Sequence, residues 1–240
     1  MAAMGSAPLP GEPAPAAPTR RQQILAAAAE LFAHRGFHGV GIDDIGAVVG
    51  ISGPGVYRHF RNKDALLGQM LVGISETLLA GGQERVRAAH AGDRAGPAEL
   101  SGETADRSRG TPDTPSATGP AAATGPAAPT GPAAALRALV RFHVAFALDN
   151  PALITVQARD LANLAEADRH RVRRLQRQYV EVWVGVIRQV APGCDEATGR
   201  AAAHAVFGLI NSTQHGTALD RAAMAPLLER MALSAVRSAT

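Results

Sequence analysis

Residues 42–67 read IDDIGAVVGISGPGVYRHFRNKDALL, and this stretch decides the fold. Its apolar spacing predicts a short helix over 42–49. The sequence GIS at 50–52 predicts a tight turn, because glycine adopts a positive φ without steric cost and serine can cap the helix that follows. We expect a third helix over 53–60 and a fourth that starts at Lys63. Two short helices joined by a three-residue turn are typical of a helix-turn-helix.

A longer helix is predicted just before this stretch, where residues 22–37 read QQILAAAAELFAHRGF. Thr19 is its expected N-cap, and Gly36 is expected to end it. The apolar residues that share one face of this helix are Ile24, Ala28, Leu31 and Phe32. Residues 19–79 therefore predict a compact helical DNA-binding domain.

The composition favours helices and excludes several classes of protein. Apolar residues make up 46% of the 240 residues and aromatic residues only 4%, with alanine prominent. The net charge of +3 is too small to indicate nucleic-acid binding by itself, and the single cysteine excludes an internal disulfide. Because the sequence contains neither a signal peptide nor 18 consecutive apolar residues, we expect a cytoplasmic protein that does not span a membrane.

The rest of the chain divides into low-complexity and helical parts. We predict a disordered tail over 1–18 and a flexible linker over 90–132, which contains most of the repeat TGPAAA-TGPAAP-TGPAAA at 118–135. We expect residues 133–240 to form a second helical domain. Its expected helices cover 135–148, 151–164, 167–190, about 195–215 and 220–238. No strand pattern occurs, so the predicted fold class is all-α.

The predicted third helix combines poor helix formers with basic residues. Gly53 and Gly55 each cost about 1 kcal/mol relative to alanine. One interpretation is that small residues let the backbone N–H groups of this helix approach DNA phosphates. The cationic or titratable residues nearby are Arg58, His59, Arg61 and Lys63.

These two stretches resemble the DNA-binding domain of TetR/AcrR-family regulators over residues 19–70. The resemblance implies that the following residues form the DNA-binding site: Ser52, Gly53, Pro54, Gly55, Tyr57, Arg58, His59 and Lys63. It places Tyr57, His59 and Lys63 against phosphates, while Pro54 and Arg58 are candidates for base contacts. The alternatives are core or cap packing for Tyr57 and His59, and a plain surface position for Lys63.

Two features depart from the family pattern. The family commonly opens the second helix with threonine or serine, whereas this chain has Gly41-Ile42. One expected phosphate contact is therefore missing. The long segment after the fourth helix is also unusual for the family.

The resemblance further implies a C-terminal ligand-binding and dimerisation domain. Dimerisation is expected through residues 195–238, although the same apolar residues could be buried within one subunit. Candidates for an effector pocket, each of which could also be ordinary core, are His143, Phe146, Gln157, Tyr179, Trp183, His204, Phe207 and Asn211. The basic run of Arg169, Arg171, Arg173, Arg174 and Arg177 is either a solvated face or an anion site, for instance for the phosphates of an acyl-coenzyme A.

The chain lacks the motifs of an enzyme, so no catalytic residue, cofactor or metal is expected. We interpret it as a sequence-specific regulator that binds duplex operator DNA as a homodimer. The resemblance implies repression that a small apolar or acylated effector relieves. The alternative is a helical small-molecule-binding protein that has lost specific DNA binding.

Overall fold

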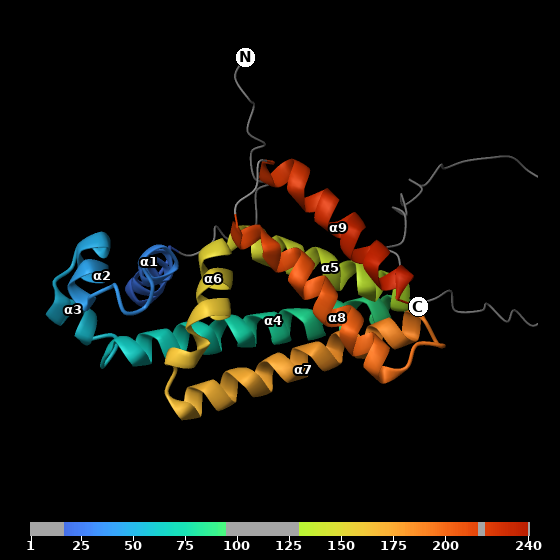
Figure 1. Ribbon diagram of the computed structural model, residues 1–240, viewed down its shortest axis with the longest axis horizontal. Coiled ribbons are helices and arrows are strands. Elements are labelled where there is room, and N and C mark those ends of the chain that lie inside the picture. Colours follow the sequence, from blue (N-terminus) through green and yellow to red (C-terminus); the bar gives the residue numbers. More distant parts are fainter. Residues whose placement is uncertain (1–16, 95–129, 216–218, 240) are drawn as a thin grey trace, which may run out of the picture. The chain divides into compact units, whose positions relative to one another are not determined.

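The computed structural model describes residues 17–94, 130–215 and 219–239, and all the regular secondary structure in these ranges is helical (Figure 1). The α-helices are α1 (Arg20–Arg35), α2 (Ile42–Val49), α3 (Gly53–Tyr57), α4 (Lys63–Arg94), α5 (Pro132–Asp149), α6 (Pro151–Asp160), α7 (Glu166–Val190), α8 (Glu196–Asn211) and α9 (Arg221–Ser238). Two 3₁₀ helices are η1 (Leu161–Asn163) and η2 (Ser212–His215). The predicted all-α class is confirmed.

The boundaries of the predicted linker differ from the structure at both ends. Helix α4 continues to Arg94, so residues 90–94 are helical, and α5 already begins at Pro132. Proline suits the first turn of a helix, where its missing N–H leaves no bond unmade. Residues 95–129 of the predicted linker, and all but the last two residues of the predicted tail, lie outside the described residues.

The chain divides into two compact units, and the division does not follow the predicted domains. The first unit contains residues up to Gly73 together with Ala152–Arg169, and the second contains Ile74–Pro151 with His170–Thr240. Most of α6 and all of η1 therefore belong with the N-terminal helices, although the sequence placed them in the C-terminal domain.

In the first unit, α2 packs against both α1 and α3. Thr19 caps α1 through a reciprocal capping box with Gln22, as its position predicted. The fully buried residues of this unit include Ile24, Ala28, Phe32, Ile45, Val56, Leu66 and Leu67. The apolar face predicted for the first helix is thus the core of the unit, apart from Leu31, which is half-buried.

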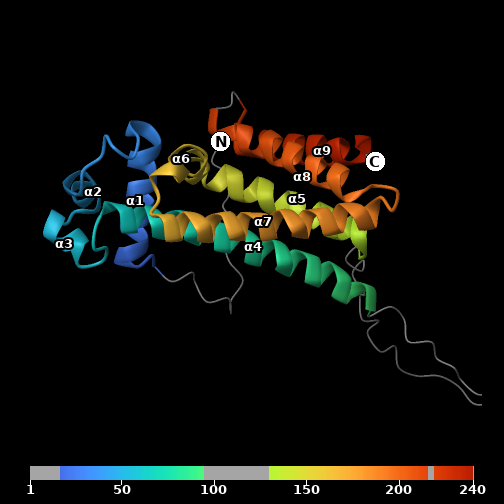
Figure 2. The same cartoon turned by 60° about the horizontal axis from the view of Figure 1, so that its bottom comes forward.

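In the second unit, α9 packs against α5 and α8, and α8 and α9 lie side by side (Figure 2). The core contains Leu139, Trp183, Ile187, Val206 and Ile210, all fully buried. The stretch Lys63–Ala91 of α4 is long and apolar enough to cross a membrane, but 56% of its most apolar window is buried inside the structure. A core helix gives the same signal, so the finding is weak evidence for a membrane span.

Candidate DNA-binding surface and effector site

The predicted helix-turn-helix is present in the first unit. Gly50 ends α2 in the left-handed conformation, with φ 75° and ψ 35°. The Ser52 hydroxyl caps α3 by accepting from the Gly55 N–H at 3.4 Å. Helix α3 ends at Tyr57 rather than at the predicted Phe60. The reason is local, because Val56 O accepts from both His59 N and Phe60 N and so tightens the chain into a turn.

The glycines of α3 have a packing explanation within the unit. Gly53 is buried, and a Cβ at this position would clash with Oδ1 of Asp43 in α2. A Cβ at Gly55 would lie 3.3 Å from Cβ of Ile51. The side of Gly53 that a Cβ would occupy therefore faces a carboxylate of the protein. Packing against α2 accounts for this glycine without a nearby phosphate.

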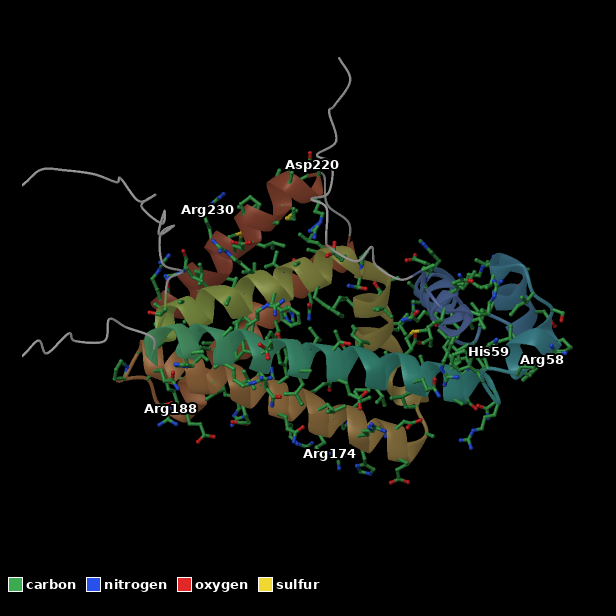
Figure 3. The ribbon with its side chains drawn as sticks, turned by 180° about the vertical axis from the view of Figure 1, so that it is seen from behind. Arg58, His59, Arg174, Arg188, Asp220 and Arg230 are labelled. Atoms are coloured by element: carbon green, nitrogen blue, oxygen red, sulfur yellow. The ribbon has the colours of Figure 1, made fainter. Side chains whose placement is uncertain are left out.

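The other residues of the predicted recognition helix are largely exposed. Pro54 and Arg58 are exposed, and Tyr57 is 53% exposed, which excludes core packing for Tyr57. The Arg58 guanidinium makes no hydrogen bond or ion pair with any described residue. Figure 3 shows Arg58 at the outer edge of the helix-turn-helix, with His59 beside it. An exposed phenol at the last residue of α3 and an unpaired guanidinium at the next residue are groups that suit contacts with bases and phosphates.

Lys63 is used inside the unit. Its Nζ donates to the carbonyl oxygens of Phe37 and Val40, both at 2.9 Å, and lies 4.5 Å from the centre of the Phe37 ring. Two of its three N–H groups are thereby occupied. In this structure Lys63 fastens the loop between α1 and α2 to the start of α4.

Two arginines at the start of α1, which the sequence did not predict as functional, bind backbone carbonyls of the helix-turn-helix. Arg20 Nη1 donates to Val49 O at 3.0 Å, at the end of α2. Arg21 Nη1 donates to His59 O at 2.7 Å, and its guanidinium lies 4.5 Å from the centre of the Phe60 ring. The adjacent RR at the start of a helix was the only signal in the sequence. Its carbonyl partners are 29 and 38 residues away.

Gly41 caps α2 without a side chain. Its N–H donates to Oδ2 of Asp44 at 2.8 Å, so the first turn of α2 is closed by Asp44. The position where the family commonly has a hydroxyl thus offers no side-chain donor to a phosphate.

In the second unit, five of the eight predicted pocket residues come together. His143 Nδ1 lies 3.1 Å from the Tyr179 hydroxyl oxygen, and His143 Nε2 lies 3.2 Å from Oδ1 of Asn211. Phe207 stacks on both the His143 and Tyr179 rings, and Trp183 meets these three rings edge-on. We call His143, Tyr179, Trp183, Phe207 and Asn211 the aromatic cluster.

Burial controls the protonation of this cluster. Desolvation lowers the pKa of His143 to about 4, against the opposing effect of its hydrogen bond to Asn211. Burial also raises the pKa of Tyr179, an effect that the nearby Trp183 indole opposes. That indole N–H nevertheless reaches no acceptor at hydrogen-bonding geometry among the described residues, and neither does the buried Thr213 hydroxyl. The cluster is thus neutral and contains an unpaired donor.

The other three candidates are not part of this buried cluster. His204 is exposed, although its ring lies edge-on to Phe207 with the ring centres 6.3 Å apart. Phe146 is half-buried, and Gln157 belongs to the first unit. An open groove of about 360 Å³ lies between α4 and α7 and is lined by Gln83, Val86, Arg87, Glu181, Val182, Gly185, Val186 and Gln189. Sequence periodicity could not locate this groove, because its lining mixes polar and apolar residues from two helices that are distant in the sequence.

The basic run of α7 is only partly paired. Arg171 forms an ion pair with Glu76 at 2.5 Å. Arg173, Arg174 and Arg177 are exposed, and Arg174 projects away from its helix in Figure 3. This arrangement agrees with the first of the two predicted alternatives, a solvated face.

The predicted dimer segment contains both buried and exposed residues. Ala202, Val206, Ile210 and Leu228 are buried within the single chain, so these residues belong to its own core. The exposed side of α8 carries small residues, namely Ala197, Ala201, Ala205 and Gly208, and Met231 of α9 is 45% exposed.

The helix-turn-helix and the separate helical unit define the class of bacterial transcriptional regulators. Two family models agree with this assignment. The model of bacterial regulatory proteins of the tetR family matches residues 24–70, and that of the tetracyclin repressor-like C-terminal domain matches residues 129–215. The chain belongs to the tetR family.

Individual relatives are similar over different extents. The HTH-type transcriptional activator FasR of Mycolicibacterium smegmatis is 38% identical over 68 residues, which cover 28% of this chain and 31% of that protein. The TetR-family regulator PfmR of Thermus thermophilus has a TM-score of 0.65 at 17% identity, over 92% of this chain and 97% of that one. FadR of Bacillus subtilis, solved with stearoyl-CoA, has a TM-score of 0.56 at 14% identity, over 89% and 97%. These two structures show that the fold is shared.

Proposed function

We propose that this chain is a sequence-specific, DNA-binding transcriptional regulator of the bacterial cytoplasm that binds a pseudo-palindromic operator as a homodimer. One observation carries the proposal: Pro54 and Tyr57 of α3 and Arg58, the residue just after it, are exposed, while Arg20 and Arg21 donate to backbone carbonyls at the end of α2 and just after α3. A rigid helix with unpaired polar groups is what reading base edges requires. Ser52, Gly55 and His59 complete the proposed surface. Gly53 and Lys63 support it from within the unit.

The test is fluorescence anisotropy of the full chain with duplex from its own upstream region, against a scrambled duplex, across a salt series. Tighter binding to the native duplex, with affinity that falls steeply as salt rises, is expected. Arg58→Gln should weaken binding to the native duplex by about tenfold, since one bidentate contact to guanine is worth about 1–3 kcal/mol. Arg188→Gln removes an exposed cation of α7 and is the matched control.

Equal binding of both duplexes, unchanged by Arg58→Gln, would favour the alternative of a ligand-binding protein without specific DNA recognition. Gly41 is the observation behind that alternative, because it removes one expected phosphate donor. Repression is the expectation for the sign of regulation. Since FasR is named an activator, transcription from the operator has to be measured with and without the chain.

The effector is proposed to be a small apolar or acylated molecule that binds at the aromatic cluster. The unpaired Trp183 N–H within a neutral, ring-lined core supports this site, and the stearoyl-CoA bound to FadR supports the ligand class. Trp183 is the only tryptophan of the chain, so its fluorescence reports on the cluster directly. Titration with stearoyl-CoA should shift this emission and release the operator. An unchanged emission with an unchanged operator affinity would exclude this ligand.

A further inference from the structure

Residues of α6 and η1 fasten the end of α1 within the first unit. Arg159 Nη1 donates to Ala33 O at 3.2 Å, and its Nη2 donates to Phe32 O. The last carbonyl groups of a helix have no partner inside that helix and carry its negative dipole end. Phe32 O also accepts from the N–H of the C-cap Gly36 at 2.8 Å, so Arg159 is its second donor. A guanidinium, with several N–H groups in one plane and a fixed positive charge, matches this end in both geometry and sign.

A buried carboxylate holds Arg159 in place. Asp160 is 4% exposed, and its Oδ2 accepts from Nη2 of Arg159 at 2.9 Å. Asn163 donates to Oδ1 of Asp160 at 3.1 Å and its own Oδ1 lies 3.1 Å from Nε2 of His38, in the loop after α1. The Arg159 side chain is 43% exposed, but its carboxylate partner is buried and accepts from both Arg159 and Asn163. Burial of one partner distinguishes the contact from an ordinary surface ion pair.

Helix α1 connects this fastening to the helix-turn-helix. Its first residue, Arg20, donates to Val49 O at the end of α2. Its second residue, Arg21, donates to His59 O, two residues after the end of α3. Its last carbonyls are held by Arg159. Since α1 has 16 residues, it is about 24 Å long. A small displacement at one end thus moves the groups bound at the other end.

We propose that Arg159, oriented by Asp160, is a positioning residue for operator binding, and that α6 and η1 are an integral part of the DNA-binding unit. Arg159 acts through α1, which sets how α3 presents Tyr57 and Arg58. The inference rests on the proposed DNA binding.

The test uses the full chain with Arg159→Met/Asp160→Asn. Removing both charges avoids leaving a buried carboxylate without a partner, so the variant isolates positioning from folding. We expect about tenfold weaker binding to the native duplex with binding to scrambled duplex retained, since two charge-assisted hydrogen bonds to α1 are lost. Arg159→Lys should recover part of the affinity, because an ammonium can still donate to one carbonyl. Arg188→Met is the matched control for loss of an arginine.

Amide hydrogen exchange of residues 52–60 supplies a readout that needs no DNA. Faster exchange there in the double variant than in Arg188→Met is expected. Wild-type operator affinity and exchange in a folded double variant would overturn the inference. If the wild-type chain binds the native and scrambled duplexes equally, the proposed function fails. The hydrogen exchange of residues 52–60 then decides by itself whether Arg159 positions this segment.

If circular dichroism shows that the double variant does not fold, the same two measurements are made on Arg159→Lys instead. Weaker operator binding together with faster exchange of residues 52–60 in Arg159→Lys would support positioning. Wild-type affinity and wild-type exchange in Arg159→Lys would show that Arg159 serves folding only.

Discussion

At the scale of single residues, four basic side chains around the helix-turn-helix fall into two sets. Arg20, Arg21 and Lys63 donate to backbone carbonyls of the unit itself, whereas Arg58 has no partner among the described residues. A cation that already donates to one or two carbonyls gains less from a phosphate than a free one does. We therefore expect Arg58 to contact DNA. Arg20, Arg21 and Lys63 instead stabilise the conformation of the surface that carries it.

Replacing Lys63 by methionine tests this division. Lys63→Met should lower the free energy of unfolding by about 1–2 kcal/mol, because two hydrogen bonds from a half-buried charged group are lost. Urea denaturation followed by circular dichroism measures the loss. Arg61→Met, at an exposed neighbouring position, is the control and should leave stability unchanged. If Lys63→Met instead leaves the free energy of unfolding unchanged but makes the DNA affinity less dependent on salt, Lys63 contacts a phosphate.

His143 should make the stability of the second unit depend on pH. Burial lowers its pKa to about 4 in the folded chain, against an ordinary value of 6.5. Above pH 6.5 both states are neutral and the stability is fully present. As the pH falls from 6.5 towards 4, only the unfolded chain takes up a proton, so stability is lost, by about 2 kcal/mol between pH 7.5 and 5.

Urea midpoints of the wild type and of His143→Gln, measured at both pH values, check this expectation. The difference between the two pH values should shrink in His143→Gln. It should persist in His204→Gln, which changes an exposed histidine near the same cluster. An equal pH dependence in all three proteins would contradict the assignment.

At the scale of elements, the helix-turn-helix depends on close backbone packing between α2 and its turn. A Cβ at Gly46 would lie 2.6 Å from Ile51 O, and backbone atoms cannot rotate away as a side chain can. Gly46→Ala should therefore cost about 2 kcal/mol of stability and reduce operator affinity, although alanine is the better helix former by about 1 kcal/mol.

Gly73→Ala is the matched control within α4. A Cβ there meets nothing within 4 Å, so the helix propensity of alanine should act alone and raise the melting temperature. Thermal unfolding followed by circular dichroism distinguishes the two substitutions. A stabilising effect of Gly46→Ala would show that α2 and the turn separate more easily than the structure indicates.

The same elements show how much of the fold could be predicted. The nine predicted helical segments all occur, because caps such as Thr19 and Ser52 and stops such as Asn150-Pro151 act on neighbouring residues. The errors lie at the ends of helices. Helix α3 stops at Tyr57 because Val56 O accepts from both His59 N and Phe60 N, and α4 continues to Arg94 through a stretch whose composition predicted a linker.

At the scale of the whole molecule, the proposed dimer needs a surface that a second copy can approach closely. The exposed alanines and Gly208 of α8 supply it, since small residues let two helices pack at short distance. Ala201→Arg should convert the dimer to a monomer in sedimentation velocity and weaken operator binding, because two half-sites then bind independently. Ala88→Arg, on the exposed side of α4, is the control. A dimer that survives Ala201→Arg would place the interface elsewhere.

The sequence alone determined the helical class, the helix-turn-helix and its caps, because hydrophobic periodicity, turn glycines and N-caps are local signals. Tertiary structure decided the rest. It turned Lys63 towards Phe37 and Val40, gathered His143, Tyr179 and Asn211 from three helices, and joined Arg159 to a helix more than a hundred residues earlier. Those contacts depend on which carbonyl or ring lies near a side chain in the folded chain. The spacing of residues along the sequence does not predict this.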